Sequence, residues 1–499
     1  MQRSNAKLNK FSILLVIGLL IAPFNSQAQE LEWSNTRKVK GRTAYARVIG
    51  ENNSGLYMLR FRNQMLTKNV VIERYRSNLS FAHARNVQLK KARLLYAELQ
   101  DTGLLFVTAH YDRKGTRNEV RCQWYNQNLD AMGKQRHVLS VGISDFYDKG
   151  DFRIRFSNNR KRILIAFTEK SDDDKRILNI HVFNERMDSL ASHRYLLDIP
   201  YNNFFLTNLM VDNFGNAYFL INEHKFAIRR DRKRDDKSTV YWYNLKQDSL
   251  RDYQIIDSGK LLRKAIFTMD RQLNKVNLTA FYADEQSPNS DGLFHFHLWP
   301  NQPERSPKLV YQEFTDKFKK QLFGDSKSAL YEDVKSFDLL RTLPGTDGGI
   351  TIVAERSSVS NETDIQYING MPTQTARNIY NFDDVLVISM DSNHQIKWKY
   401  LINKSQSSLN DNGYYSSVVI ANTRAHLYIM YNDRLRTNGD VLQYKFTSDG
   451  KVTYKILVRS DNHYTSIIPS EAKQIAYNRV ILPVTKDRKF SLLKLDYIN

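Results

Sequence analysis

The chain of 499 residues contains a single cysteine, Cys122, and therefore cannot form an internal disulfide. Glycine and proline are also scarce, at 20 and 10 residues, whereas tyrosine and phenylalanine contribute 28 and 26. This composition favours strands over disorder, so the stability of the chain must come from a packed core. Cys122 falls on a predicted strand with bulky neighbours, and we expect it to be a buried, inert thiol.

The familiar local motifs of catalysis and cofactor binding are missing as well. The sequence has no G-x-S-x-G, H-E-x-x-H, Walker or G-x-G-x-x-G motif, so we predict neither a metal nor another cofactor and assign no catalytic residue. Carboxylates from distant parts of the chain could still meet in the fold, and linear sequence does not show such pairs.

Two short patterns resemble metal sites but lack part of the required set of ligands. His295 and His297 stand two residues apart on a predicted strand and share one face, but no third ligand is evident nearby. The acidic segment from Asp212 to Asn216 lacks the ligand spacing of a calcium loop and is better explained as a turn between two strands. We assign no metal to either place.

Long apolar runs are absent beyond the N-terminus. There, a basic start precedes the apolar stretch from Phe11 to Phe24, which at 14 residues is too short to span a bilayer comfortably. Ser26 and Ala28 supply the small residues that a signal peptidase reads, so residues 1–28 are interpreted as a signal peptide. An uncleaved membrane anchor is the alternative. No cysteine follows the run, which excludes a lipid anchor there, and the mature chain 29–499 is expected to contain no transmembrane segment.

Positive charge is in large excess. The net charge is +21, and removing the three basic residues of the signal peptide leaves +18. On an exported chain this excess suggests an anionic neighbour such as lipopolysaccharide, acidic glycan, a membrane surface or an acidic protein, and nucleic acid is an unlikely partner outside the cytoplasm. Alternatively, the charge only keeps an aromatic-rich surface soluble.

Hairpins of the form strand, polar turn, strand recur along the chain. Their third-strand ends are spaced by 49 to 60 residues, except for one interval of 92. These ends are Tyr75, Tyr125, Phe183, Tyr243, Leu298, Met390, Phe446 and Leu495. Four strands can be traced in most units, and repeats of this length made of four antiparallel strands predict a β-propeller. We expect an all-β fold of eight blades, with seven as the alternative because the fifth unit is weak.

The two ends of the mature chain complement each other. The last unit ends at the strand Phe490–Tyr497 and lacks one strand, whereas the segment Leu31–Val39 has no hairpin partner of its own. We therefore predict that this N-terminal strand pairs with the last one and closes the ring.

Three insertions interrupt the repeats, at residues 223–238, 315–334 and 356–381. In a propeller with the first strand innermost, all three project from the rim that carries the second-to-third-strand loops and the connections between blades. Long loops on a rigid scaffold tend to carry binding, so this rim is the predicted binding surface. Tolerated surface variation is the alternative.

The first insertion is strongly basic and supplies our candidate ligand-binding residues. They are Arg229, Arg230, Arg232, Lys233 and Arg234. Arginine side chains could grip a sulfated, phosphorylated or carboxylated ligand, although such a run can also be merely solvated.

The second insertion has apolar residues at helical spacing, beginning with Phe318, Leu322 and Phe323. We expect a short amphipathic helix packed down on the blades, with docking of a partner as the alternative.

Short turn motifs resemble those of exported β-propeller proteins of Bacteroidota bacteria. They are the phrase from Asp212 to Tyr218, the turn from Ser448 to Lys451, and the strand ending Tyr431-Asn432-Asp433. The resemblance implies a Gram-negative periplasm or cell envelope and transfers no catalytic residue.

Together these patterns predict a non-catalytic cell-envelope propeller that binds an anionic glycan or protein partner on the insertion-bearing rim. The rival is a secreted hydrolase or lyase acting on glycan or peptide in the central funnel of that rim, and a third possibility is a scaffold in an envelope complex. The side chains that line the funnel are the observation that discriminates between them.

Overall fold

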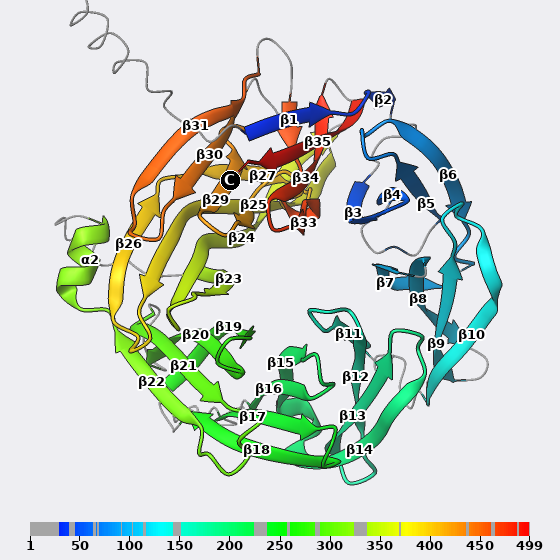
Figure 1. The fold of residues 1–499 in the computed structure, drawn as a ribbon, viewed down its shortest axis with the longest axis vertical. Coiled ribbons are helices and arrows are strands. Elements are labelled where there is room, and N and C mark those ends of the chain that lie inside the picture. Colours follow the sequence, from blue (N-terminus) through cyan, green and yellow to red (C-terminus); the bar gives the residue numbers. More distant parts are fainter. Residues whose placement is uncertain are drawn as a thin grey trace, which may run out of the picture.

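The computed structural model describes residues 29–38, 45–62, 66, 69–90, 92–101, 103–112, 116–142, 151–223, 237–256, 260–284, 290–323, 337–368, 371–435, 439–460, 465–486 and 489–498. In these residues the chain is all-β, with eight antiparallel sheets that follow one another around a ring (Figure 1). The one described α-helix, α2 (Asp316–Phe323), lies on the outside of this ring.

We number the sheets by their order in the chain. Sheet 1 contains β3 (Tyr45–Asn52), β4 (Gly55–Phe61), β5 (Val70–Tyr75) and β6 (Phe81–Val87). Sheet 2 contains β7 (Arg93–Gln100), β8 (Gly103–Asp112), β9 (Arg117–Tyr125) and β10 (Ala131–Gly142). Sheet 3 contains β11 (Arg153–Phe156), β12 (Arg162–Lys170), β13 (Lys175–Asn184) and β14 (Ser189–Pro200). Sheet 4 contains β15 (Phe204–Val211), β16 (Ala217–Glu223), β17 (Lys237–Asn244) and β18 (Ser249–Ile256).

The second half of the ring repeats the plan with additions. Sheet 5 contains β19 (Lys260–Asp270), β20 (Lys275–Asp284), β21 (Gly292–Leu298) and β22 (Lys308–Glu313). Sheet 6 contains β23 (Phe337–Pro344), β24 (Ile350–Ile368), β25 (Met371–Met390), β26 (Ile396–Ile402) and the short β27 (Gln406–Leu409). Sheet 7 contains β28 (Val419–Asn422), β29 (Leu427–Asn432), β30 (Val441–Phe446) and β31 (Val452–Val458). The weak fifth repeat of the sequence thus forms a complete four-stranded sheet.

Sheet 8 is built from both ends of the chain. Its C-terminal strands are β32 (Thr465–Ile467), β33 (Lys473–Ala476), β34 (Arg479–Lys486) and β35 (Lys489–Tyr497). The N-terminal strand β1 (Gln29–Trp33) runs antiparallel to β35 with Leu31 opposite Leu495, and β2 (Arg37–Lys38) continues the pairing. The predicted partnership between the two ends is therefore present in the described residues, while Val39 lies outside them.

The burial pattern explains why the repeats form sheets. Second strands such as β8 and β16 are buried along most of their length, whereas outer strands such as β14 alternate between buried and exposed residues. A strand that packs between two neighbouring sheets buries both faces, and an outermost strand buries only one. Each apolar cluster joins two adjacent sheets, as Leu164 of sheet 3 and Phe219 of sheet 4 do, so the core runs around the ring.

Strand direction sets the two rims. In sheets 1 to 6 the first strand lies toward the centre of the ring, and in sheet 8 β33 lies toward the centre while β1 lies outside (Figure 1). Because neighbouring strands are antiparallel, the second-to-third-strand loops and the connections between sheets emerge on one rim, which we call the connection rim. The first-to-second and third-to-fourth turns emerge on the other, which we call the turn rim.

Candidate functional site

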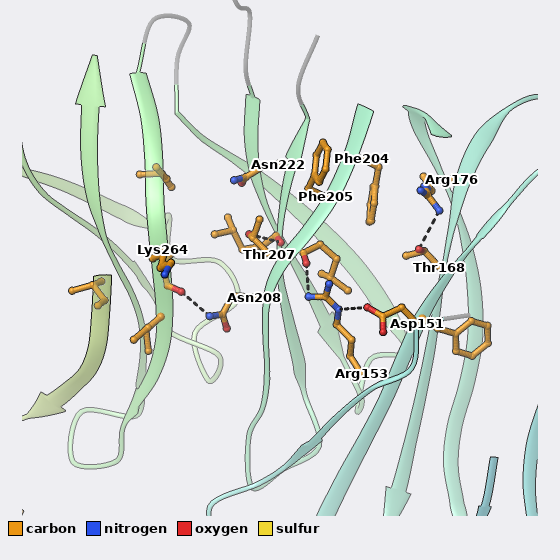
Figure 2. A pocket seen from close by; sticks show the side chains of 17 residues that line it. Asp151, Arg153, Thr168, Arg176, Phe204, Phe205, Thr207, Asn208, Asn222 and Lys264 are labelled. Carbon is orange, nitrogen blue, oxygen red and sulfur yellow. Dashed lines mark hydrogen bonds and ion pairs between the residues drawn. The ribbon is translucent and has the colours of Figure 1, made fainter. Parts of the chain in front are cut away.

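A pocket of about 690 Å³ opens on the connection rim, where sheets 3, 4 and 5 meet. Its walls come from the beginnings of the first strands β11, β15 and β19, and from the ends of the second strands β12 and β16. Its lining combines apolar residues, among them Leu206, Leu220 and Leu339, with charged and amide side chains, which Figure 2 labels. The predicted rim thus bears a concave site among the described residues.

Arg153 reaches across the pocket from β11. Its Nη1 donates a hydrogen bond to the backbone oxygen of Leu206, 2.5 Å away, and its Nε lies 3.5 Å from Asp151 Oδ2. About a third of the Arg153 side chain is exposed, and its Nη2 donates to no acceptor among the described residues. A guanidinium held on one side and open on the other can offer a donor to an anion.

A second guanidinium lines the wall nearest sheet 3. Arg176 stacks over the ring of Tyr201 at 3.5 Å, and its Nε donates to the backbone oxygen of that residue at 3.0 Å. Its Nη1 also lies 3.4 Å from the hydroxyl of Thr168. These contacts hold the positive charge at the edge of the pocket.

The third cation is Lys264, on the opposite wall. Its backbone has a φ of +37°, at an irregularity in the pairing of β19 with β20, and the side chain is 62% exposed. It forms an ion pair with Asp338 of sheet 6, and Asp338 also accepts a hydrogen bond from the Ser357 hydroxyl. Among the pocket-lining residues Asp151 is the one carboxylate against three cations, so the pocket carries net positive charge.

Strand β15 places an aromatic ring and polar side chains between these cations. Phe205 is 42% exposed although it is a large apolar residue, and Thr207, two positions on, is exposed on the same face. Asn208 donates to the backbone oxygen of Ala265 at 2.6 Å, and Asn222 at the end of β16 accepts from Ser238 at 3.1 Å. Figure 2 shows these side chains around one space.

The basic residues predicted from sequence, Arg229 to Arg234, lie outside the described residues. Their loop leaves β16 at Glu223, which directly follows the pocket-lining residue Asn222. It returns into β17 at Lys237. The loop is therefore anchored at the edge of the pocket.

The other two insertions are described in part. Phe318 of α2 is 5% exposed and stacks on Phe314 at 4.5 Å, and Leu322 and Phe323 pack against the same apolar cluster. The helix is thus packed onto the sheets, as expected, and residues 324–334 lie outside the described part. The third insertion extends β24 and β25 into a long hairpin that also pairs with β27.

Next to the pocket, between sheets 6 and 7, the connection rim is held by a buried polar network. Lys404 Nζ lies 3.0 Å from Glu355 Oε1, and both side chains are only 1% exposed. Glu355 also accepts from the Ser417 hydroxyl, and Gln406 accepts from Lys404 and from the Ser417 amide at 3.1 and 2.8 Å. Burial raises the pKa of Glu355 and lowers that of Lys404, and their mutual attraction opposes both changes.

The connection between sheets 6 and 7, residues 406–418, reaches beyond its own sheets. The Tyr414 hydroxyl accepts a hydrogen bond from the amide of Ala46, in the first strand of sheet 1, at 2.8 Å. The turn before it requires glycine, because Gly413 has a φ of +65° and an added Cβ would lie 2.3 Å from the ring of Phe382. The connection between sheets 6 and 7 is thereby joined to sheet 1, a contact that sequence reasoning missed.

The two histidines on β21 acquire a third imidazole that sequence reasoning also missed. His394, in the third-to-fourth-strand turn of sheet 6, stacks on His295 and on His297 with ring centroids 4.7 Å apart in each case. The planes are within 12° of parallel, so the rings are stacked. No group of His, Cys, Asp or Glu within the described part is arranged to hold a metal ion.

Hydrogen bonds and burial set the charge of these histidines. His297 Nε2 lies 2.7 Å from His394 Nε2, while its Nδ1 faces the side-chain oxygen of Asn277 at 2.6 Å. Burial lowers the pKa of His295 to about 3, that of His297 to about 2 and that of His394 to about 4. The nearby positive charge of Lys275 acts in the same direction, so the cluster is neutral at pH 7.

Two further predictions concern single residues. Asp212 closes the turn between β15 and β16, where its Oδ1 accepts from the amides of Phe214, Gly215 and Asn216, each at 2.9 Å. It is a structural turn, as predicted. Cys122 is buried on β9, and burial raises the pKa of its thiol, which agrees with an inert thiol.

The pocket residues carry only a weak signal in the sequence. Phe205 and Thr207 alternate with buried leucines along β15, as in any half-buried strand. Nothing local shows that Arg153, 52 residues before Phe205, lines the same space. No described helix is long and apolar enough to cross a membrane.

Comparisons with known proteins find only distant likenesses to solved structures. No protein-family model and no curated protein matches the chain. Among solved structures it is similar to the WD40 domain of SCAP from fission yeast, at 9% identity and a TM-score of 0.39, over 94% of this chain and 98% of that one. It is also similar to the β-propeller domain of the Trilobed protease from Pyrococcus furiosus, at 8% identity and a TM-score of 0.35, over 87% and 97%. An apocarotenoid oxygenase variant from Synechocystis gives 9% identity and a TM-score of 0.34, over 94% and 93%. At these values the likeness carries no inference about activity or ligand, and the chain is described by its own architecture as an all-β ring of antiparallel sheets.

Proposed function

We propose that this chain is an exported, non-catalytic binding protein of a Gram-negative cell envelope. In this proposal the eight sheets act as eight blades of one propeller closed by the N-terminal strand. Its connection rim binds an anionic glycan or protein partner. The observation that carries the proposal is the pocket between sheets 3, 4 and 5, where Arg153, Arg176 and Lys264 outnumber a single carboxylate.

Charge and position support this function together. The basic loop that contains Arg229 to Arg234 is anchored beside the pocket, and the chain as a whole is strongly positive. A concave site with cations at its mouth concentrates anions before they dock. The rival function is a hydrolase or lyase that acts on glycan or peptide in the central funnel. Of these activities, glycoside hydrolysis needs two carboxylates flanking the scissile bond, and the described lining of this pocket supplies one, Asp151.

The proposal is tested by binding of the mature protein to an immobilised acidic polysaccharide, polygalacturonate, at increasing salt. Affinity should fall steeply between low salt and about 0.15 M, where the Debye length shrinks to about 8 Å. The variant with Arg229, Arg230, Arg232 and Lys233 all replaced by Ser should bind about tenfold more weakly, as expected from the loss of about 1.4 kcal/mol of electrostatic attraction.

A matched control removes the same charge from the turn rim. Four of its exposed basic residues, Lys161, Lys246, Arg271 and Lys451, are each replaced by Ser. If this control weakens binding as much as the loop variant, binding depends on net charge alone and the proposed rim is wrong. Glycan cleavage by the wild-type protein would instead establish the hydrolase or lyase.

A further inference from the structure

Resting on the proposed function, we propose that the pocket between sheets 3, 4 and 5 recognises a single acidic sugar residue. The sugar ring lies against Phe205, and its carboxylate pairs with Arg153. The pocket volume of about 690 Å³ falls in the range of small-ligand sites, which bury most of a compact ligand. A protein partner would instead require a broad, well-packed surface.

The aromatic ring provides the first part of this recognition. Phe205 stays 42% exposed in the pocket, whereas its neighbours Phe204 and Leu206 are buried at 6% and 7%. The face of an aromatic ring is negatively polarised and attracts the positively polarised C–H groups on one face of a pyranose. A bare inorganic anion has no such apolar face and would leave Phe205 unused.

The carboxylate recognition follows from how Arg153 is held. Its hydrogen bond to Leu206 O and its contact with Asp151 fix the guanidinium plane against β15, the strand that carries Phe205. Arginine suits planar carboxylates because its donors lie in one plane. Lys264, 62% exposed on the opposite wall, adds a second positive charge that does not require a fixed direction.

Polar side chains complete the match to a sugar. The Thr207 hydroxyl donates to Leu220 O at 3.1 Å, which leaves its oxygen able to accept, and Asn208 and Asn222 present amide groups to the same space. A pocket that combines an exposed ring, a fixed guanidinium and several amide or hydroxyl groups can satisfy a sugar's ring, carboxylate and hydroxyls together.

The experiment is titration calorimetry of the mature protein with a trimer of galacturonic acid. The probes for comparison are the corresponding trimer of galactose and inorganic sulfate. We expect the acidic trimer to bind at least tenfold more tightly than either. Phe205→Ala should weaken it about tenfold, as the loss of a ring contact of about 1.4 kcal/mol would do, and Arg153→Gln should remove the preference over galactose.

The matched control for the ring is Phe214→Ala. Phe214 is 60% exposed and lies on the turn rim, so its loss should leave binding unchanged. Thermal unfolding of each variant shows that it is folded, and Phe205→Ala tests the proposal even if Arg153→Gln proves unstable.

The outcomes separate this inference from the proposed function. If polygalacturonate and sulfate compete equally, and Phe205→Ala binds like wild type, the connection rim binds anions but the acidic-sugar site is wrong. If galactose trimers bind as well as the acidic ones, recognition of the carboxylate is wrong. If no anionic probe binds and salt has no effect, the proposed function itself fails.

Discussion

The connection rim differs between the two sides of the ring. Around sheets 3, 4 and 5 the first strands leave an open pocket of about 690 Å³ with exposed cations. Around sheets 6, 7 and 8 the pocket lined by Arg341 and Ser417 measures about 260 Å³, and the buried Lys404–Glu355 pair lies beside it. One side therefore has room for a ligand, while the other is filled by contacts between sheets.

The filled side lies next to sheet 8, where the two ends of the chain pair. Sheet 8 packs against sheets 7 and 1, and residues 406–418 join that region through Tyr414 and Ala46. On the filled side, the buried side chains each have several hydrogen-bond or ion-pair partners. On the pocket side, the polar side chains have fewer partners and are partly exposed. We therefore expect substitutions on the filled side to affect stability and those on the pocket side to affect binding.

The largest effect should come from deleting residues 29–38, which removes β1 and β2. The deletion exposes the edge of β35 and removes the hydrogen bond from the Leu492 amide to Ser34 Oγ, 2.8 Å long. We expect a loss of about 5 kcal/mol or more, comparable with the whole stability of many domains, together with aggregation through the bare edge. Thermal unfolding and size-exclusion chromatography measure both, against the chain lacking residues 1–28 alone. An unchanged melting temperature would show that the closing strand is dispensable.

Lys404→Met should come next, because it leaves Glu355 as a buried, unpaired carboxylate. Removing one partner of a buried pair costs about 3–5 kcal/mol. Urea unfolding at pH 7 measures this cost. The control is Lys451→Met, which breaks an ion pair with Asp449 on a side chain that is 82% exposed and should change stability by less than about 1 kcal/mol. If the two substitutions lower the free energy of unfolding equally, the buried pair stabilises the protein no more than an exposed one does.

Acid should destabilise the contact between sheets 5 and 6 through the histidine cluster. The folded-state pKa values of His295, His297 and His394 lie below the ordinary value of about 6.5. The unfolded chain therefore binds more protons between that value and pH 4, and stability falls as the pH drops below about 6.5. Each neutral histidine contributes a slope of about 1.4 kcal/mol per pH unit in that window.

His394→Asn should reduce this slope by about 1.4 kcal/mol per pH unit, the contribution of one histidine. Asparagine tolerates the backbone φ of +64° at this position. The measurement is urea unfolding between pH 7 and pH 4.5, with the wild-type protein as the reference. A variant whose pH dependence matches wild type would show that the cluster is already protonated in the folded protein.

The smallest effect on stability should be that of Lys264→Gln on the pocket side. It removes an ion pair in which Lys264 is 62% and Asp338 19% exposed, and Asp338 keeps the hydrogen bond from Ser357, so we expect a loss of about 1 kcal/mol. Urea unfolding should therefore resemble wild type, while binding of polygalacturonate weakens. A large loss of stability would show that Lys264 stabilises the fold as much as the buried Lys404–Glu355 pair does.

The sequence by itself determined the repeat and the partnership of the two chain ends. The repeat is visible in local properties of the sequence: alternating apolar residues, polar turns and the spacing of third-strand ends from Tyr75 to Leu495. The partnership of the ends is visible because the last unit lacks one strand and the N-terminal segment has no hairpin partner. The helix from Asp316 to Phe323 and the turn at Asp212 were also predictable, since both depend on residues within a few positions.

Only the tertiary structure decided which side chains meet across sheets. His394 stands 97 residues from His297, and Ser417 stands 62 from Glu355. The pocket joins Arg153, Phe205 and Lys264 from three successive sheets. Strand patterns are set within one sheet by the alternation of its residues, but the register and angle between neighbouring sheets are set by how their side chains pack. No short-range pattern records that packing, so the candidate site could not be derived from the sequence alone.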